Sequence, residues 1–196
     1  MKRFIIASAC AIAVLAMSSC SKEESHDYPY SPVPFTSVNV TDSFWGQRLK
    51  ASREVTIPLA FSKCEETGRY NNFVEAAQQM ASDENLGFKV GGLPFDDTDI
   101  YKTVEGASYL LQTYPDPKLE AYIDSVLVLV AAAQEPDGYL YTARTLGGNK
   151  SIDGTARWEG LKWTHEFYNP GHMYEAAVAW YEATGKRNLL DVAIRS

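Results

Sequence analysis

The sequence predicts an all-α fold, part of an (α/α)6 toroid built of helical hairpins. Apolar residues recur three and four positions apart over most of the chain, which is the period of an amphipathic helix. Short breaks rich in proline and glycine separate these runs and join them in pairs. The pattern also repeats, since EGASYLLQTYPDPKLEAYID aligns with EAAVAWYEATGKRNLLDVAI at an offset of 70 residues. Repeated hairpins indicate a helical array, whose usual closed form is a toroid.

The folded domain is expected to begin near residue 37 with its least regular helices. Thr41 or Asp42 is expected to cap a helix that runs to about Lys50. Pro58 interrupts the next run, which continues to Cys64. The segment NNFVEAAQQMAS predicts a further helix with one apolar face.

The strongest helical pattern lies between residues 96 and 135. Two amphipathic runs flank the break YPDP, so we expect an antiparallel hairpin. Its apolar positions are Ile100, Val104, Ala107 and Leu111, then Leu119, Ile123, Val126, Leu127 and Val130. Pro136 ends the second helix, and a short extended piece over 139–142 and a glycine-rich loop over 144–163 are expected to follow.

The second copy of the hairpin runs to the end of the sequence. Only roughly half the helices of a closed ring are predicted, and an open half-ring would expose apolar helix faces. We therefore expect residues 37–196 to be the N-terminal part of a larger toroidal domain, truncated after about half the barrel.

The first twenty residues, MKRFIIASACAIAVLAMSSC, resemble a bacterial lipoprotein signal. Lys2 and Arg3 precede an apolar run that is too short to span a bilayer comfortably. We expect residues 1–19 to be a signal peptide, with lipid carried by Cys20, and 20–36, which hold three prolines, to be a flexible tether. An ordinary cleaved signal peptide is the alternative.

This N-terminus predicts an exported lipoprotein of the outer membrane, on the periplasmic face or the cell surface. The lipid would be its only membrane contact. The whole chain has a net charge of −7 and no basic cluster, which argues against nucleic-acid binding. Cys64 is the one cysteine of the predicted mature domain, which excludes an internal disulfide framework there.

The segment WTHEFYNPGHMYEAA gathers the side chains best suited to chemistry. A zinc-protease motif needs a second histidine four residues after the first, and Asn169 occupies that position. We expect Pro170 and Gly171 to break the helix before His172. The cluster of His165, Glu166, Tyr168 and His172 would instead lie at the rim of the helical scaffold and bind sugar hydroxyls. Aromatic walls would come from Trp158, Trp163, Phe167 and Tyr168. The alternative for His172 is a packing or capping role.

A second polar cluster, PFDDTDIYK, stands at the start of the strongest helical run. Asp96, Asp97 and Asp99 are suited to capping the helix. Three carboxylates where one cap suffices also favour a substrate contact from Asp97 or Asp99. Sequence alone gives no carboxylate separation, so no acid and base pair can be assigned.

Four segments together resemble glycoside hydrolase family 127, the β-L-arabinofuranosidase family. They are SVNVTDSFWGQRLKASREVTIP, DDTDIYKTVEGASYLL, YPDPKLEAYIDSVLVLVAAAQEPDGYL and RWEGLKWTHEFYNPGHMYEAAVAWYEATGKRNLLDVA. The resemblance implies an (α/α)6 catalytic domain that removes terminal β-L-arabinofuranose from arabinose-containing oligosaccharides or polysaccharides, with retention. It also implies a sugar contact for His165 and a place at the rim of the site for residues 99–102.

The resemblance further implies a zinc-bound cysteine nucleophile, with one glutamate and three cysteines as ligands, and a separate glutamate as acid/base. All of these are expected downstream of the matched segments, so this chain contains no catalytic residue or zinc ligand and should be inactive alone. Two alternatives stay open. One is a non-catalytic carbohydrate-binding lipoprotein, and the other is another (α/α)6 enzyme such as an unsaturated-uronide hydrolase or a sugar epimerase.

Overall fold

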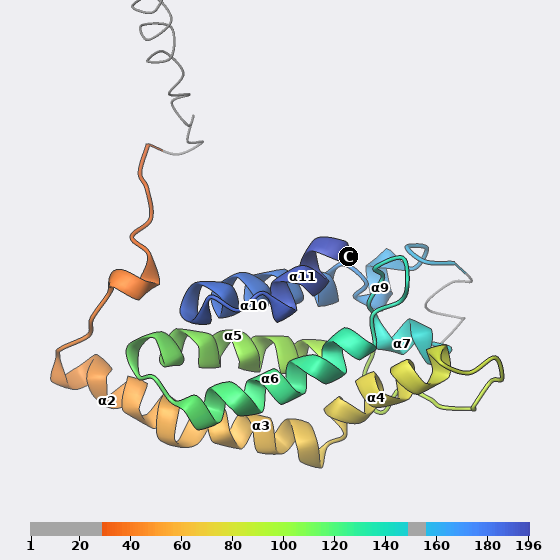
Figure 1. Cartoon of the computed structure of the whole chain (residues 1–196), viewed down its shortest axis with the longest axis horizontal. Coiled ribbons are helices and arrows are strands. Elements are labelled where there is room, and N and C mark those ends of the chain that lie inside the picture. The colour runs from red at the N-terminus through yellow and green to blue at the C-terminus, as the bar shows by residue number, and fades with distance from the viewer. Residues whose placement is uncertain (1–28, 149–155) are drawn as a thin grey trace, which may run out of the picture. The chain divides into compact units, whose positions relative to one another are not determined.

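The computed structural model describes residues 29–148 and 156–196, and every regular element in these ranges is a helix (Figure 1). The predicted all-α class is therefore confirmed. Residues 35–196 form one compact unit, and residues up to Pro34 belong to a separate one. The predicted signal peptide and Cys20 lie outside the described residues, as does the middle of the predicted glycine-rich loop. In the described ranges, no helix has the length and apolar character needed to cross a membrane.

The compact unit begins with a short 3-10 turn, η1 (Phe35–Ser37), and a helical rod. The rod comprises α2 (Ser43–Ala51), the π-helical turn η2 (Ser52–Thr56) and α3 (Ile57–Glu66), and α4 (Arg69–Met80) follows after Gly68. Asp42 caps α2 as predicted, because its Oδ1 accepts the N–H groups of Phe44 and Trp45. The predicted interruption at Pro58 is wrong. The wider turn η2 leads directly into α3, whose first turn tolerates a proline.

Two helical hairpins follow, and both match the predicted repeat. The first is α5 (Asp97–Thr113) with α6 (Pro117–Ala132), and the second is α10 (Tyr168–Thr184) with α11 (Asn188–Arg195). The aligned pairs Ala107 and Ala177, and Leu110 and Trp180, are all buried. The two hairpins are therefore equivalent units of a helical toroid.

Helix α10 begins earlier than the sequence predicts. It starts at Tyr168, so Pro170 and Gly171 lie inside its first turn and do not break it. The physical reason is that the first N–H groups of a helix have no partner within the helix, and a proline there removes no hydrogen bond. His172 is consequently a helical residue.

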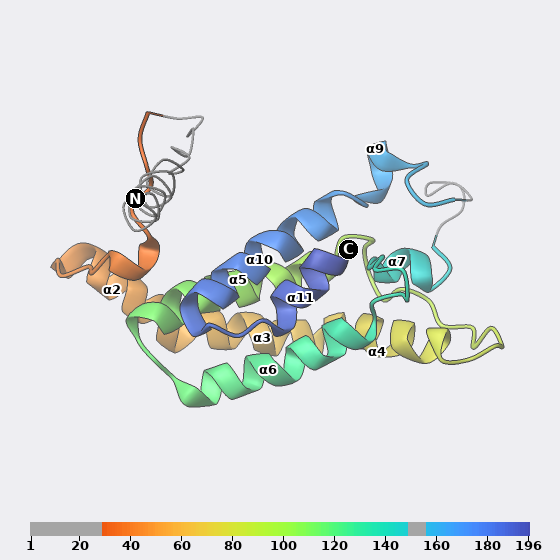
Figure 2. The same ribbon diagram turned by 45° about the horizontal axis from the view of Figure 1, so that its top comes forward.

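The core lies between the hairpins and the α3–α4 pair. Helices α5 and α10 pack side by side along their length, and both begin at the end of the molecule where α7 (Thr142–Thr145) and α9 (Leu161–Thr164) lie (Figures 1 and 2). The expected extended piece is accordingly shorter than predicted, because Thr142 already belongs to α7. The largest fully buried side chains are those of Trp180, Tyr101, Tyr141, Phe73, Ile100 and Ile123.

Candidate functional site

The segments that carry the predicted site residues meet where α5 and α10 begin. Both carboxylate oxygens of Asp97 bind Thr142: Oδ2 accepts its backbone N–H at 3.0 Å and Oδ1 its hydroxyl at 2.6 Å. At the start of α10 the side-chain amide of Asn169 donates to the carbonyl oxygens of His165 (2.9 Å) and Pro94 (3.4 Å). These bonds bring the loop before α5, the segment around α7 and the loop before α10 together.

His165 lies at the junction of α9 and α10 in a left-handed conformation, with φ 60° and ψ 22°. Its partly exposed imidazole lies between two aromatic rings, 4.7 Å from that of Phe95 and 5.6 Å from that of Tyr168, measured between centroids. Its Nδ1 is 3.1 Å from the carbonyl oxygen of Trp163. The tautomer with a proton on Nδ1 makes this hydrogen bond and leaves Nε2 as an acceptor.

Tyr168 and His172 continue along α10 from His165. The exposed hydroxyl of Tyr168 accepts a hydrogen bond from Lys102 at 2.5 Å, and its ring meets that of His172 edge to face at 4.6 Å. Nδ1 of His172 is buried, 3.3 Å from a carboxylate oxygen of Glu175, without the geometry of a hydrogen bond. His172 therefore lies beside Tyr168 and one turn along α10 from it.

Glu166 lies next to His165 but faces the protein interior. Its side chain is 0% exposed. Oε1 accepts hydrogen bonds from the Tyr139 hydroxyl (2.5 Å) and Arg144 Nε (2.9 Å), and Oε2 accepts one from the Trp158 backbone N–H (3.0 Å). Burial and the bond to Glu166 raise the pKa of Tyr139 above its usual range, so this phenol stays protonated. A sugar hydroxyl would have to displace one of these donors to reach Glu166.

The three aspartates before and in α5 lie in different surroundings. Asp96 is buried, and its Oδ2 accepts the N–H of Leu93 at 2.9 Å and lies 3.3 Å from an Arg69 nitrogen. It makes no side-chain cap to α5, so the capping alternative does not hold for it. Asp97 is buried against Thr142, whereas Asp99 is 43% exposed and binds Arg69 Nε at 3.0 Å. Asp99 is thus the more accessible of the two aspartates predicted to contact substrate.

Sequence reasoning missed Arg144 and Tyr139 as parts of this site. They lie 22 and 27 residues before Glu166 in the chain, on the far side of the glycine-rich segment. A buried glutamate needs a cation or several donors nearby, but the sequence contains no pattern that assigns Arg144 to this role. Tyr139 belongs to the predicted extended piece and Arg144 begins the predicted loop, so neither position indicates a contact with Glu166.

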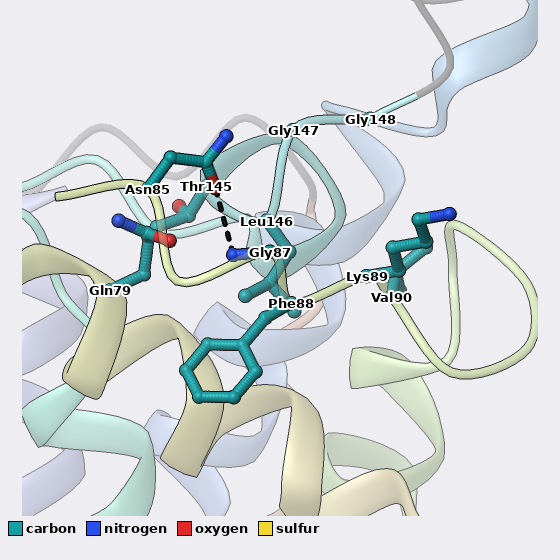
Figure 3. A pocket seen from close by; sticks show the side chains of 10 residues that line it. All are labelled: Gln79, Asn85, Gly87, Phe88, Lys89, Val90, Thr145, Leu146, Gly147 and Gly148. Carbon is teal, nitrogen blue, oxygen red and sulfur yellow. Dashed lines mark hydrogen bonds between the residues drawn. The ribbon is translucent and has the colours of Figure 1, made fainter.

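Two hollows adjoin these segments. One of about 400 Å³ is lined by Tyr139, Arg157, Trp158, Phe167 and Tyr174, among others. The rings of Trp158 and Phe167 stack there with centroids 5.0 Å apart. The other, of about 560 Å³, lies between the loop after α4 and α7 and contains no predicted site residue (Figure 3). Its amide side chains bind their own loop: Asn85 Oδ1 accepts the N–H of Gly87, and Gln79 binds the backbone of Glu84 and Leu86.

The residues of the folded unit do not provide the zinc ligands that the resemblance implies. Three cysteines are required, and Cys64 is the one cysteine between residues 37 and 196. Cys64 is buried in α3, and burial raises the pKa of its thiol, although a hydrogen bond with Thr103 acts in the opposite direction. Ligand atoms of Glu105, His172 and Glu175 lie within 4.8 Å of one another, but this set contains no sulfur.

The sequence of this chain is similar to those of known proteins. Residues 37–196 match the family model described as β-L-arabinofuranosidase, GH127 catalytic domain. The chain is 33% identical over 176 residues to the non-reducing end β-L-arabinofuranosidase of Bifidobacterium longum subsp. longum, an alignment that covers 80% of this chain and 26% of that protein.

Two solved structures are also similar. The GH127 β-arabinofuranosidase BT3674 is 67% identical with a TM-score of 0.78, covering 86% of this chain and 26% of that one. The GH127 β-L-arabinofuranosidase Ara127N-Se from Geobacillus stearothermophilus T6 is 36% identical with a TM-score of 0.71, covering 81% and 24%. The chain thus spans about a quarter of the length of the relatives it matches.

Proposed function

Because this chain belongs to the GH127 β-L-arabinofuranosidase family, we propose that the protein in which it occurs is a glycosidase that releases terminal β-L-arabinofuranose from plant glycans. The observation that carries the proposal is the position of His165. This histidine stands at the end of the toroid where the long loops gather, and its ring lies between Phe95 and Tyr168. Relatives that match about four fifths of this chain are named for this activity.

The role of these residues is to bind and orient the terminal sugar. The free Nε2 of His165 can accept a hydrogen bond from a sugar hydroxyl, while the Tyr168 hydroxyl and Lys102 can donate. Phe95 and Tyr168 provide apolar surface beside the imidazole for a ring carbon face. Asp99 is accessible at the same end of α5. Glu166 and Asp97 are buried and hold the neighbouring segments, Glu166 through Arg144 and Asp97 through Thr142.

The bond-breaking groups are proposed to lie outside this chain. A retaining reaction needs a nucleophile and an acid/base at a defined separation. Near His165 the carboxylates of Glu166 and Asp97 are buried and hydrogen-bonded, and the accessible Glu175 lies beside His172, about two turns along α10 from Tyr168. We therefore propose that the nucleophile, the acid/base and the zinc ligands come from another part of the full-length protein, and that this chain alone binds sugar without hydrolysing it.

The test is a comparison of His165→Ala with the parent full-length protein on an aryl β-L-arabinofuranoside. We expect kcat/KM to fall at least about tenfold, because a buried sugar hydroxyl would lose its partner. His26→Ala, outside the described residues, is the matched control and should retain parent activity. Retention of activity by His165→Ala, with unchanged circular dichroism, would disprove the sugar-binding role.

The location of the protein is a separate proposal. We propose that lipid on Cys20 anchors the protein in the outer membrane, at the periplasmic face or the cell surface. Labelled palmitate fed to expressing cells should enter the parent protein and be absent from Cys20→Ala. Equal labelling of both proteins would contradict the anchor.

A further inference from the structure

Two residues of the candidate site adopt a backbone conformation that side chains disfavour. Among the described residues, Trp158 (φ 70°) and His165 (φ 60°) are the non-glycine residues with positive φ. A left-handed conformation costs about 1–2 kcal/mol for a residue with a Cβ atom, so surrounding contacts must maintain it. Both residues present a ring to the site region, Trp158 by stacking on Phe167 and His165 by lying between Phe95 and Tyr168.

Both strained residues are attached to Glu166. The backbone N–H of Trp158 donates to Glu166 Oε2, and His165 is joined to Glu166 through the peptide bond. On the other side of His165, Thr164 fixes the turn, because its hydroxyl oxygen accepts the Glu166 N–H at 3.3 Å. The carboxylate of Glu166 therefore links the two ends of the segment 158–165.

The Glu166 carboxylate is itself held rigidly. Arg144 and Tyr139 bind Oε1, and the carboxylate is removed from water, so its attraction to the guanidinium is weakly screened. Burial lowers the pKa of Arg144, but its hydrogen bond to Glu166 and the attraction of that carboxylate raise it by more, so the guanidinium stays protonated. A carboxylate with this many donors has no free position for a sugar hydroxyl.

We propose that Glu166 is a positioning residue, which holds His165 and the Trp158–Phe167 ring pair in place and does not contact the sugar. The inference rests on the proposed function, in which His165 binds the terminal arabinose. Glu166 then acts through His165 and Trp158, and its loss lowers affinity by releasing the strained backbone at both residues.

A double-mutant cycle in the full-length protein separates positioning from direct contact. Glu166→Gln keeps one acceptor oxygen. Its amide NH₂ lies against either Arg144 or the Trp158 N–H, and neither of these donors can accept a hydrogen bond from it. We expect kcat/KM on an aryl β-L-arabinofuranoside to fall about tenfold, mainly through a higher KM. In the His165→Ala background the same change should lower kcat/KM by less than about threefold, because the residue of the pair that binds the sugar is missing.

Two outcomes separate this inference from the proposed function. If His165→Ala lowers activity and Glu166→Gln lowers it by the same factor with and without His165, the positioning role is overturned. If His165→Ala has no effect, the proposed function fails, whatever Glu166→Gln does. Asp124→Asn, which breaks the ion pair with Lys186 at the far end of the hairpins, controls for general loss of an ion pair and should retain parent kinetics.

A spectroscopic measurement tests the contact between Glu166 and Trp158 without an activity assay. In the full-length protein, Glu166→Gln should change the near-ultraviolet circular dichroism in the indole region as much as Trp158→Phe does, because the stacked indole loses its anchor. The far-ultraviolet spectrum and the Asp124→Asn spectrum should match the parent. An unchanged indole signal in Glu166→Gln would show that Glu166 does not hold Trp158.

Discussion

Asp97 connects the first turn of α5 to α7 through a carboxylate that water does not reach. Burial raises its pKa to about 6 from an ordinary 3.8; the nearby Asp96 adds to the rise, and the two hydrogen bonds from Thr142 oppose it. Between pH 6 and 4 the folded protein therefore retains a proton that the unfolded chain releases. Because the folded state binds this proton more tightly than the unfolded chain does, Asp97 makes the fold more stable as the pH falls from 7 toward 4.

The prediction concerns the pH dependence of the free energy of unfolding. The stabilising contribution of Asp97 between pH 7 and 4.5 is roughly 2 kcal/mol and should be missing from Asp97→Asn, which does not titrate. Urea unfolding of both proteins at the two pH values measures it. Other groups, such as Asp137 and Glu66 with their lowered pKa values, contribute equally to both proteins and cancel in the difference. Parallel pH profiles would contradict the raised pKa.

His165 allows a test of backbone strain at the same scale. Asparagine tolerates φ near 60° and valine does not, so His165→Val should unfold more easily than His165→Asn by about 1 kcal/mol. The control is the same pair of substitutions at Glu182, an exposed position of the right-handed helix α10, where valine and asparagine have similar propensities. Urea midpoints would report the difference. An equal difference at both positions would rule out strain at His165.

At the residue scale, the sequence predicts those parts of the site that are close in the chain. His165, Tyr168 and His172 are close in sequence, so one helix start places them together. The surroundings of Glu166 depend on Arg144 and Tyr139, which reach it across a long loop. The sequence around Glu166 does not show whether its carboxylate faces solvent or the interior, because that depends on contacts with residues distant in the chain.

The elements themselves follow from local chemistry, with differences where proline is involved. The apolar period and the YPDP break define α5 and α6 closely, because every predicted apolar position of the two helices except Leu119 is buried. Pro58 and Pro170 are read as interruptions in sequence. Pro170 stands in the first turn of α10, where its missing N–H has no cost, and Pro58 follows the wider π-helical turn η2, so neither interrupts the chain.

The start of α6 gives a prediction at this scale. Asp116 Oδ1 accepts the N–H groups of Lys118 and Leu119, as Asp42 does at the start of α2. Asp116→Ala should lower the free energy of unfolding by about 1 kcal/mol, because α6 contributes buried side chains to the core. Asp42→Ala removes an equivalent cap from a helix with no buried residue, and should leave global stability nearly unchanged. Thermal unfolding of the two variants measures the difference. Equal losses of stability in both would contradict the claim that α6, and not α2, contributes to the core.

At the scale of the whole molecule, the candidate site is carried by the two helices that are most deeply built into the core. The first turns of α5 and α10 hold Asp97, Tyr168 and Asn169, and the remainder of both helices packs together. Trp180 is completely buried, and its Nε1 donates to Asn188 Oδ1 at 2.7 Å, which fixes α10 to α11. The site is therefore positioned by core packing as well as by its loops.

Amide hydrogen exchange of the 196-residue chain should show this arrangement. We expect the slowest exchange in the middle of α5 and α10, where opening requires separation of the core, and the fastest helical exchange in α2, which has no buried residue. Residues 164–169 should exchange slowly relative to other connecting segments, because Asn169 of α10 binds back to His165 and Glu166 attaches the segment to Arg144 of α7. Exchange in that segment as fast as in α2 would mean that its bonds open independently of the core. The geometry around His165 would then depend on bound sugar to form.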